Sequence, residues 1–179
     1  QAGSVKWFKE LSISIPEEIN NKSHIWEKEG KTLVNVAVNE SWIGIIAVSD
    51  TLREESTEVI NQLKQSGLEV YLLTGDQKSS GEYFADQLRI ENVYTELLPH
   101  EKVEHVIKIQ NSSGRVAMVG DGINDAPALA AADIGIAIGS GTDVAMETSD
   151  IVLMRDDLSS LLNAWQLSKR MVNKIKQNL

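Results

Sequence analysis

The sequence predicts an α/β fold in which a parallel sheet with crossover helices follows a shorter, antiparallel segment. Two observations support this. Residues 1–48 contain alternating apolar and polar stretches, which are typical of half-buried strands. From Asp50 onward, short apolar runs alternate with helical patterns, which is the signature of parallel strands joined by helices. The 179 residues are enough for one sizeable core, or for one domain and part of another.

The first segment predicts antiparallel strands. Residues 12–15 and 34–38 alternate, and Asn39-Glu40-Ser41 separates the second stretch from the apolar run 42–48, so that 34–48 predicts a hairpin. We expect residues 1–48 to form an antiparallel fragment distinct from the α/β body.

The body of the chain predicts alternating helices and strands. The predicted strands are 68–73, a short one near Val93, 116–119, 134–138 and 151–154, the fourth followed by a turn at 139–141. The first predicted helices are about 52–63 before Gly67 and about 79–88. A third follows Pro99, buries Val103, Val106 and Ile107 and ends at Gly114, and a fourth is entered through Asn124, Asp125 and Pro127. A closing helix begins at about Asp157 and turns five apolar residues toward the sheet or a neighbour: Leu158, Leu161, Leu162, Trp165 and Val172.

Composition excludes several function classes. The net charge of −9 and the absence of a basic patch argue against a nucleic-acid partner. Without cysteine there is no disulfide or thiol nucleophile, and the three histidines are scattered. No apolar run reaches the roughly 18 residues of a membrane helix, and no signal peptide is recognisable. The chain does not begin with Met, so we expect a fragment.

Residues 116–130 are the stretch on which the functional prediction depends. A buried strand ends in Gly120-Asp121-Gly122 and leads into a helix that Asn124 or Asp125 can cap, with Pro127 in the first turn. Capping accounts for one acid but not for Asp121, which lies where open α/β sheets bind ligands. Oxygen side chains at Asp121, Asn124 and Asp125 suit Mg²⁺. A capped junction without an ion is the plainer alternative.

A second strand end carries related chemistry. Thr74-Gly75-Asp76 follows the strand 68–73, and Lys102 lies on the helix before the strand that leads to Asp121. A hydroxyl, an ammonium and an Mg²⁺-binding carboxylate suit a transferring phosphoryl group. Taken alone, the first motif is equally well a plain turn and Lys102 a solvated lysine.

These motifs resemble the phosphorylation domain of a P-type ATPase, a cation pump of the haloacid dehalogenase-like superfamily. The resemblance rests on Thr74-Gly75-Asp76, on Leu98-Pro99 followed by Lys102, and on GDGINDAPAL. Asp50-Thr51-Leu52-Arg53 resembles the hinge between the nucleotide-binding and phosphorylation domains. Ala2-Gly3-Ser4 before Trp7 resembles the glycine-Asn element of the heavy-metal branch, and residues 131–153 lean toward its copper pumps.

The resemblance implies a Rossmann-like parallel sheet with helices on both faces, preceded by part of an antiparallel, β-rich nucleotide-binding domain. It implies the domains 1–48 (nucleotide binding), 49–156 (phosphorylation) and 157–179 (a helix leading toward the membrane). ATP and Mg²⁺ are the implied cofactors, and the implied parent is a multi-pass membrane pump with this part on its cytoplasmic side. The implied site residues are Thr74, Gly75, Asp76, Lys102 and Asn124 for catalysis, Gly3, Asp50, Arg53, Thr74 and Gly75 for the nucleotide, and Asp121 and Asp125 for Mg²⁺.

Several parts of the family pattern are missing, and the nucleophile motif is the most consequential. The family's nucleophile lies in Asp-Lys-Thr-Gly-Thr, which does not occur here, and the actuator domain and membrane helices are also absent. In the superfamily the nucleophile strand is central, flanked by the strands that lead to Thr74 and to Gly120. We therefore predict that 69–73 and 115–119 do not pair, and that they leave a slot of about 9–10 Å. A separate segment, carrying the missing motif, is expected to fill it.

Two other functions stay open. The first is a self-contained phosphatase of the same superfamily with Asp50 as nucleophile, although Leu52 stands where such phosphatases have a second Asp. The second is a non-catalytic nucleotide-binding or metal-binding regulator, which the missing nucleophile favours. The four cations Lys169, Arg170, Lys174 and Lys176 fit either a helix end near an anionic membrane or a solvated helix end.

Overall fold

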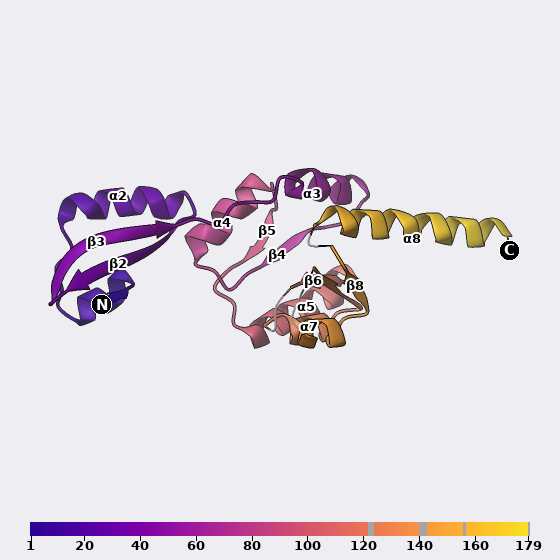
Figure 1. The fold of residues 1–179 in the computed structure, drawn as a ribbon. Helices are drawn as coiled ribbons and strands as arrows, with labels where there is room; N and C mark the ends of the chain where they lie inside the picture. Colours follow the sequence, from indigo (N-terminus) through magenta and orange to yellow (C-terminus); the bar gives the residue numbers. More distant parts are fainter. Residues whose placement is uncertain (122–123, 140–142, 156, 179) are drawn as a thin grey trace.

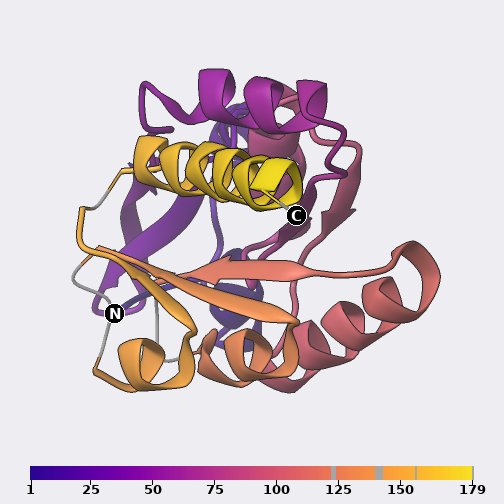
Figure 2. The ribbon, with the colours of Figure 1, turned by 90° about the vertical axis from the view of Figure 1, so that its right-hand side faces the viewer.

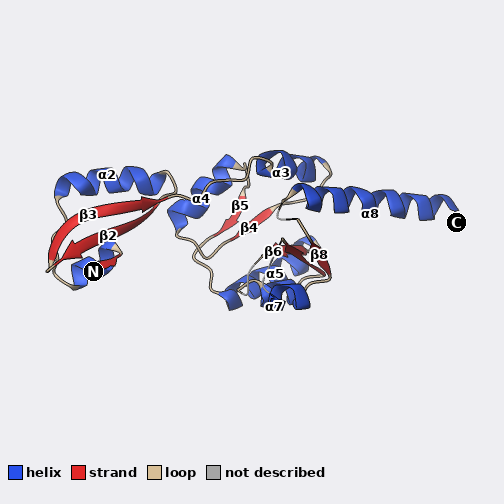
Figure 3. Ribbon diagram, in the orientation of Figure 1, coloured by secondary structure: helices blue, strands red, loops and turns tan. Residues whose placement is uncertain are grey.

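The computed structural model describes residues 1–121, 124–139, 143–155 and 157–178. Gly122 of the glycine-bracketed turn, residues 140–141 of the turn predicted at 139–141, and both Asp156 and Leu179 lie outside the described residues. Helices pack around short strands, and a long helix extends to the C-terminal end of the chain (Figure 1; Figure 3).

The first segment forms an antiparallel sheet with strand order β1-β2-β3. The hairpin is present as predicted: β2 (Thr32–Val38) pairs with β3 (Ser41–Val48), and the short β1 (Ala2–Gly3) lies on the other side of β2. Its small core contains Phe8, Ile13 and Ala37, with Ile15 and Trp42 packed against them.

Two helices of this segment were not predicted. They are α1 (Val5–Glu10) and α2 (Glu17–Lys28), and the prediction of a strand at 12–15 was wrong. Ser12 has a φ of 57°, so the chain turns there instead of extending. Ile13 is buried in the core of this segment. The alternation at 12–15 therefore reflects a connection between the two helices that buries Ile13, and not a strand.

The body is an α/β arrangement in which parallel strands lie among helices, which confirms the predicted fold class. Its strands are β4 (Tyr71–Leu73), β5 (Asn92–Tyr94), β6 (Ala117–Gly120), β7 (Ile134–Ile138) and β8 (Ile151–Leu153). Its helices are α3 (Ser56–Gln65), α4 (Lys78–Gln87), α5 (Pro99–Ser113), α6 (Ala126–Ala131), α7 (Asp143–Thr148) and α8 (Ser159–Asn178).

The parallel strands of the described residues form two separate sheets. β4 pairs with β5, and β6, β7 and β8 pair in that order, whereas β4 and β6 share no ladder. The prediction that these two strands do not pair is therefore confirmed. The width of the slot and its filling by another segment stay predictions.

Helices on both faces connect the two sheets (Figure 2). On one face, Leu158 just before α8 and Leu161 in its first turn pack against Val59 and Leu63 of α3. The same two leucines also pack against Ile136 and other residues of the β6-β7-β8 sheet. On the other face, Leu73 of β4 packs against Val106, Met118, Ala128 and Leu129. The Tyr94 ring at the end of β5 also contacts His105 of α5, with 4.1 Å between ring centroids.

Several boundaries and orientations differ from the predictions. β4 begins at Tyr71 instead of 68, Leu52 precedes its helix, and α7 was not predicted. Ile107, predicted to be buried, is 46% exposed, since Val106 and Ile109 are the buried residues of α5. Val172 is also 46% exposed. None of the helices described in 1–121, 124–139, 143–155 and 157–178 has both the length and the apolar character needed to cross a membrane.

One carboxylate fixes the start of β6. Asp133, between α6 and β7, accepts hydrogen bonds from the Val116 backbone N–H at 2.8 Å and from the Gln110 side chain at 2.9 Å. The Val116 hydrogen bond, followed by that of Gln110, holds the pKa of Asp133 below its ordinary value of 3.8. A single side chain thus ties together α5, β6 and the turn before β7.

The first prediction concerns the pH dependence of this contact. Because the folded-state pKa is depressed, the Asp133 carboxylate stabilises the fold fully above the unfolded value and loses this effect as the pH falls toward the folded value. We expect Asp133→Asn to lower the melting temperature at neutral pH, with a difference from wild type that narrows between about pH 5 and about pH 3. Glu104→Gln, an exposed change on α5, is the control. A difference independent of pH would contradict the assignment.

Candidate functional site

The loop after β4 holds Thr74 by both backbone and side-chain hydrogen bonds. The Thr74 N–H donates to the Tyr94 carbonyl at 2.9 Å, and its own carbonyl accepts from the Leu97 N–H at 3.1 Å. The Thr74 hydroxyl donates to Asp76 Oδ2 at 2.8 Å and accepts from the Asp76 N–H at 3.1 Å. Thr74 is half-buried while Gly75 and Asp76 are exposed, so the hydroxyl is fixed at the carboxyl end of β4.

Two glycines make this loop possible. A Cβ at Gly81, in the middle of α4, would lie 2.4 Å from Thr95 Cγ2 and 3.1 Å from Thr74 Cγ2. A Cβ at Gly75 would lie 3.2 Å from the Leu97 carbonyl oxygen. Sequence reasoning missed Gly81. A glycine inside a helix costs about 1 kcal/mol relative to alanine, and that local disadvantage was the available signal of a close approach.

Lys102 and Asp125 form an ion pair at the other strand end. The Lys102 ammonium lies 2.7 Å from Asp125 Oδ1, and the two side chains are only 12% and 15% exposed. Glu101 holds the start of α5, because its carboxylate accepts the Leu98 N–H at 2.8 Å. Lys102 is therefore not the solvated lysine of the plainer alternative.

Gly120 allows Asp125 to reach this position. A Cβ at Gly120 would lie 2.7 Å from Asp125 Cβ and 2.9 Å from its Oδ2. The sequence left open whether Asn124 or Asp125 caps α6. Asp125 occupies the N-cap position, but its side chain makes no capping hydrogen bond. The carboxylate is turned toward Lys102, and the Asp125 carbonyl accepts the Leu129 N–H at 2.8 Å instead.

Asp121 and Asn124 are both exposed next to the end of β6. No group of three or more His, Asp or Glu side chains surrounds a common point in the parts of the chain that the structure describes. The donor set nevertheless fits Mg²⁺, which needs one or two carboxylates and takes its remaining ligands from water and phosphate. Asp121 is the carboxylate best placed for this, since Asp125 is engaged by Lys102.

The residues predicted to meet the nucleotide come from other parts of the chain. Gly3 ends β1 of the antiparallel sheet, and a Cβ there would lie 2.3 Å from the Trp7 ring. Ser4 caps α1 by accepting the Trp7 N–H at 3.2 Å. Asp50 and Arg53 are exposed between β3 and α3. The structure does not place these residues in one site with Thr74 and Lys102.

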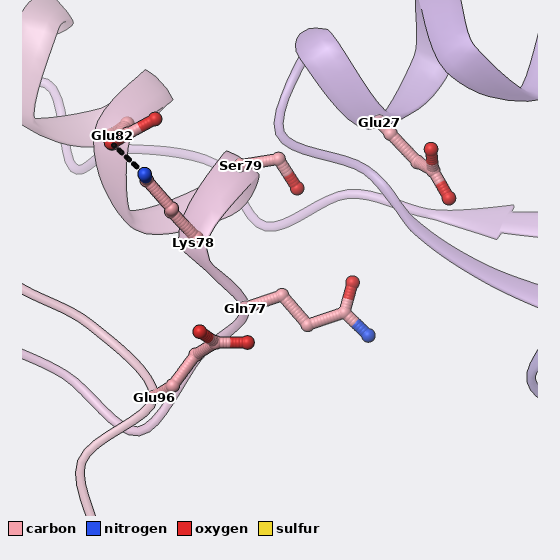
Figure 4. A pocket seen from close by; sticks show the side chains of 6 residues that line it. All are labelled: Glu27, Gln77, Lys78, Ser79, Glu82 and Glu96. Atoms are coloured by element: carbon pink, nitrogen blue, oxygen red, sulfur yellow. Dashed lines mark ion pairs between the residues drawn. The ribbon is translucent and has the colours of Figure 1, made fainter.

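A pocket of about 450 Å³ lies between α2 and the start of α4 (Figure 4). Glu27, Gln77, Lys78, Ser79, Glu82 and Glu96 line it, and Lys78 pairs with Glu82 at 3.6 Å. None of the predicted site residues is among them. Three glutamates against one lysine disfavour a phosphate group there, so the pocket does not replace the two strand ends as the candidate site.

The second prediction tests the Lys102–Asp125 pair. Removing either partner leaves a charge in a mostly buried position, so Lys102→Met and Asp125→Ala should each destabilise the chain, and the double variant should cost less than the sum. We expect a coupling of about 1–3 kcal/mol in urea unfolding. The exposed pair Lys78–Glu82 is the matched control, with a coupling of at most about 0.5 kcal/mol. Additive effects at Lys102 and Asp125 would refute the pairing.

Comparisons with known proteins agree with the fold. A haloacid dehalogenase-like hydrolase family model matches residues 1–133. A zinc-transporting PIB-type ATPase in its E2.Pi state has a TM-score of 0.81 at 40% identity, over 92% of this chain and 27% of that chain. The catalytic domain of a CPx-ATPase studied for conformational changes upon nucleotide binding has a TM-score of 0.64 at 31% identity, over 74% of this chain and 56% of that one.

The curated relatives point to the same group. The copper-exporting P-type ATPase of Staphylococcus aureus (strain MW2) is 45% identical over 177 residues, which is 99% of this chain. This chain spans 22% of the length of that relative. The resemblance inferred from the motifs is thus confirmed. The chain belongs to the haloacid dehalogenase-like hydrolase family, and within it is a homologue of the heavy-metal P-type ATPases.

Proposed function

We propose that the chain is the catalytic part of an ATP-driven heavy-metal cation pump that works through an aspartyl-phosphate. One observation carries the proposal: polar pairs lie at the ends of two strands that do not pair with each other. The Thr74–Asp76 pair follows β4, and the Lys102–Asp125 pair lies at the end of β6. Phosphate-binding groups of this kind belong at the carboxyl edge of an open parallel sheet. The phosphorylated Asp would come from a strand between them, outside this chain.

The proposed domains follow the change of architecture along the chain. Residues 1–48 are assigned to the nucleotide-binding domain, 49–156 to the phosphorylation domain and 157–179 to a helix leading toward the membrane. Gly3, Asp50 and Arg53 are assigned to ATP together with Thr74 and Gly75. Gly3 lies in the antiparallel segment, so its assignment requires that segment to approach the body when the nucleotide binds, as hinge-bending domains do.

The proposed chemistry divides between the two strand ends. The attacking Asp carboxylate forms a bond to the γ-phosphorus of ATP while the bond to the bridging oxygen breaks and ADP leaves. The Thr74 hydroxyl and the Gly75 N–H hold the equatorial oxygens, and the Lys102 ammonium, already paired with Asp125, also donates to them. Asp76 orients Thr74 through its 2.8 Å hydrogen bond. Asn124 completes the polar network beside Asp121.

Mg²⁺ is the proposed cofactor at Asp121, with Asp125 next to it. When bound, the ion would offset the phosphate charge and orient the transferring group. Lys102 limits the part that Asp125 can take, because one of its oxygens already accepts the ammonium. We therefore expect the Mg²⁺ dependence of phosphate binding to be determined mainly by Asp121.

Copper is the proposed cargo, since the copper-exporting relative is 45% identical. Zinc is the rival, because a zinc-transporting ATPase matches at 40% identity. The ligands that select the ion would lie in membrane helices of the parent pump, which we place in the membrane with this part on the cytoplasmic side. ATPase activity of the complete protein, measured with each ion in turn, distinguishes the two.

The alternatives receive less support. Asp50 follows β3 of the antiparallel sheet, so it does not share the carboxyl edge of the parallel strands that a superfamily nucleophile occupies. A non-catalytic regulator needs neither a mostly buried Lys102–Asp125 pair nor a threonine hydroxyl fixed at a strand end. Both functions are separated from the pump by the experiments below.

The third prediction concerns Asp121. Asp121→Asn should lower Mg²⁺-dependent binding of a phosphate analogue such as beryllium fluoride or vanadate by about tenfold or more, because the carboxylate is the main protein ligand. Glu96→Gln, an exposed change in the loop after β5, is the control. Binding that survives in Asp121→Asn but is lost in Asp125→Asn would move the metal to Asp125.

The fourth prediction concerns the missing strand. A peptide with an apolar strand followed by Asp-Lys-Thr-Gly-Thr should bind the chain, because β4 and β6 each have one edge without a ladder among the residues that the structure describes. With labelled ATP and Mg²⁺ we expect an acid-stable, hydroxylamine-sensitive phosphopeptide, and none when the peptide Asp is replaced by Asn. Label on the protein itself that disappears in Asp50→Asn would establish the phosphatase alternative.

A further inference from the structure

The residues that follow β5 hold the loop after β4 through their backbone. The Leu97 N–H donates to the Thr74 carbonyl at 3.1 Å, and the Glu96 N–H donates to the Asp76 carbonyl at 2.9 Å. The Glu96 side chain is exposed and lies at the pocket shown in Figure 4, so it is the backbone of this residue that holds the loop. We call residues 95–97 the 95–97 segment. It extends the contact between the two strands beyond the last pair of their ladder.

Thr95 packs this segment onto helix α4. A Cβ at Gly81 would lie 2.4 Å from Thr95 Cγ2 and 3.1 Å from Thr74 Cγ2, so the methyl groups of both threonines lie against the helix backbone at this glycine. Gly81 is buried and Thr95 is half-buried. The helix can approach the two strand ends this closely only because residue 81 has no side chain.

This contact determines how the Thr74 side chain is oriented. Thr74 is β-branched, so a methyl group placed against α4 also fixes the direction of the hydroxyl. The hydroxyl then donates to Asp76 Oδ2 at 2.8 Å and accepts from the Asp76 N–H at 3.1 Å. Because α4 begins at Lys78, shortly after Asp76, a shift of the helix would also move this carboxylate. The Thr95 methyl group occupies the space beside Gly81 and opposes such a shift.

From these contacts we propose that Thr95 is a positioning residue for the Thr74 hydroxyl. Its methyl group packs on α4 beside that of Thr74 and keeps the Thr74 methyl group turned toward Gly81. The 95–97 segment also leads directly into α5, which carries Lys102, so a displaced Thr95 would disturb both phosphate-binding groups. The inference rests on the proposed function, because it concerns the same site, but it assigns a residue outside the motifs that indicated that function.

Paired substitutions at Gly81 and Thr95 in the 179-residue chain test this. Gly81→Ala adds a methyl group where that of Thr95 already lies. We therefore expect the Asp76 amide proton to exchange with solvent about tenfold faster and Mg²⁺-dependent vanadate binding to weaken about tenfold. Thr95→Ser removes the conflicting methyl group and keeps the hydroxyl, so Gly81→Ala with Thr95→Ser should restore most of both losses. Amide exchange is followed by nuclear magnetic resonance and needs no ligand.

Gly44→Ala is the matched control, because nothing lies within 4 Å of a Cβ at Gly44 in β3. It should leave Asp76 exchange and vanadate binding at their wild-type values. The inference is overturned if Gly81→Ala changes neither quantity, or if its losses persist in the double variant. Loss of vanadate binding in Thr95→Val at unchanged Asp76 exchange would also overturn it, because Thr95 would then contact the ligand through its hydroxyl. A wild-type chain that binds no vanadate would count against the proposed function alone, since the exchange rates still decide the inference.

Discussion

The packing of Leu158 and Leu161 between α3 and the β6-β7-β8 sheet is the contact on which the body of this molecule depends. No ladder joins β4 to β6 in the described chain, so backbone hydrogen bonds do not hold the halves of the parallel arrangement together. Side chains hold the halves together on both faces. On one face these side chains belong to α8. On the other face Leu73 packs against residues of α5, β6 and α6, and Tyr94 contacts His105. Such packing is non-directional and tolerates a change in the distance between the halves better than a ladder would.

The candidate site is divided between the same two halves of the body. Thr74 and Asp76 belong to the half that contains β4, whereas Lys102 and Asp125 belong to the half that contains β6. Each pair is fixed locally by a glycine that lets backbone and side chain approach, Gly81 for Thr74 and Gly120 for Asp125. The two pairs are therefore each preorganised, while their mutual distance is set by the bridging helices. A strand between β4 and β6 would fix that distance by hydrogen bonds.

Sequence reasoning succeeded where local chemistry decides the structure. The glycine and proline signals around Gly114, Gly120 and Pro127, and the apolar period of 134–138, gave boundaries within a few residues of those observed. It did not predict α2, because the apolar positions of that helix are few. It also predicted a strand at 12–15, where the alternation of apolar residues belongs to a connection between two helices. The Lys102–Asp125 contact spans 23 residues, and only the fold determines that Asp125 faces Lys102 instead of capping its own helix.

The charge at the two strand ends explains why a cation is needed for the proposed reaction. Asp76 follows β4, Asp121 and Asp125 follow β6, and Lys102 is already neutralised by Asp125 at 2.7 Å. A phosphoryl group entering between them would meet net negative charge, and two like charges at 4 Å repel by about 4 kcal/mol at the effective dielectric of a protein surface. Thr74 and backbone N–H groups supply dipoles but no net positive charge. Substrate binding and metal binding at Asp121 should therefore be thermodynamically coupled, with each raising the affinity for the other.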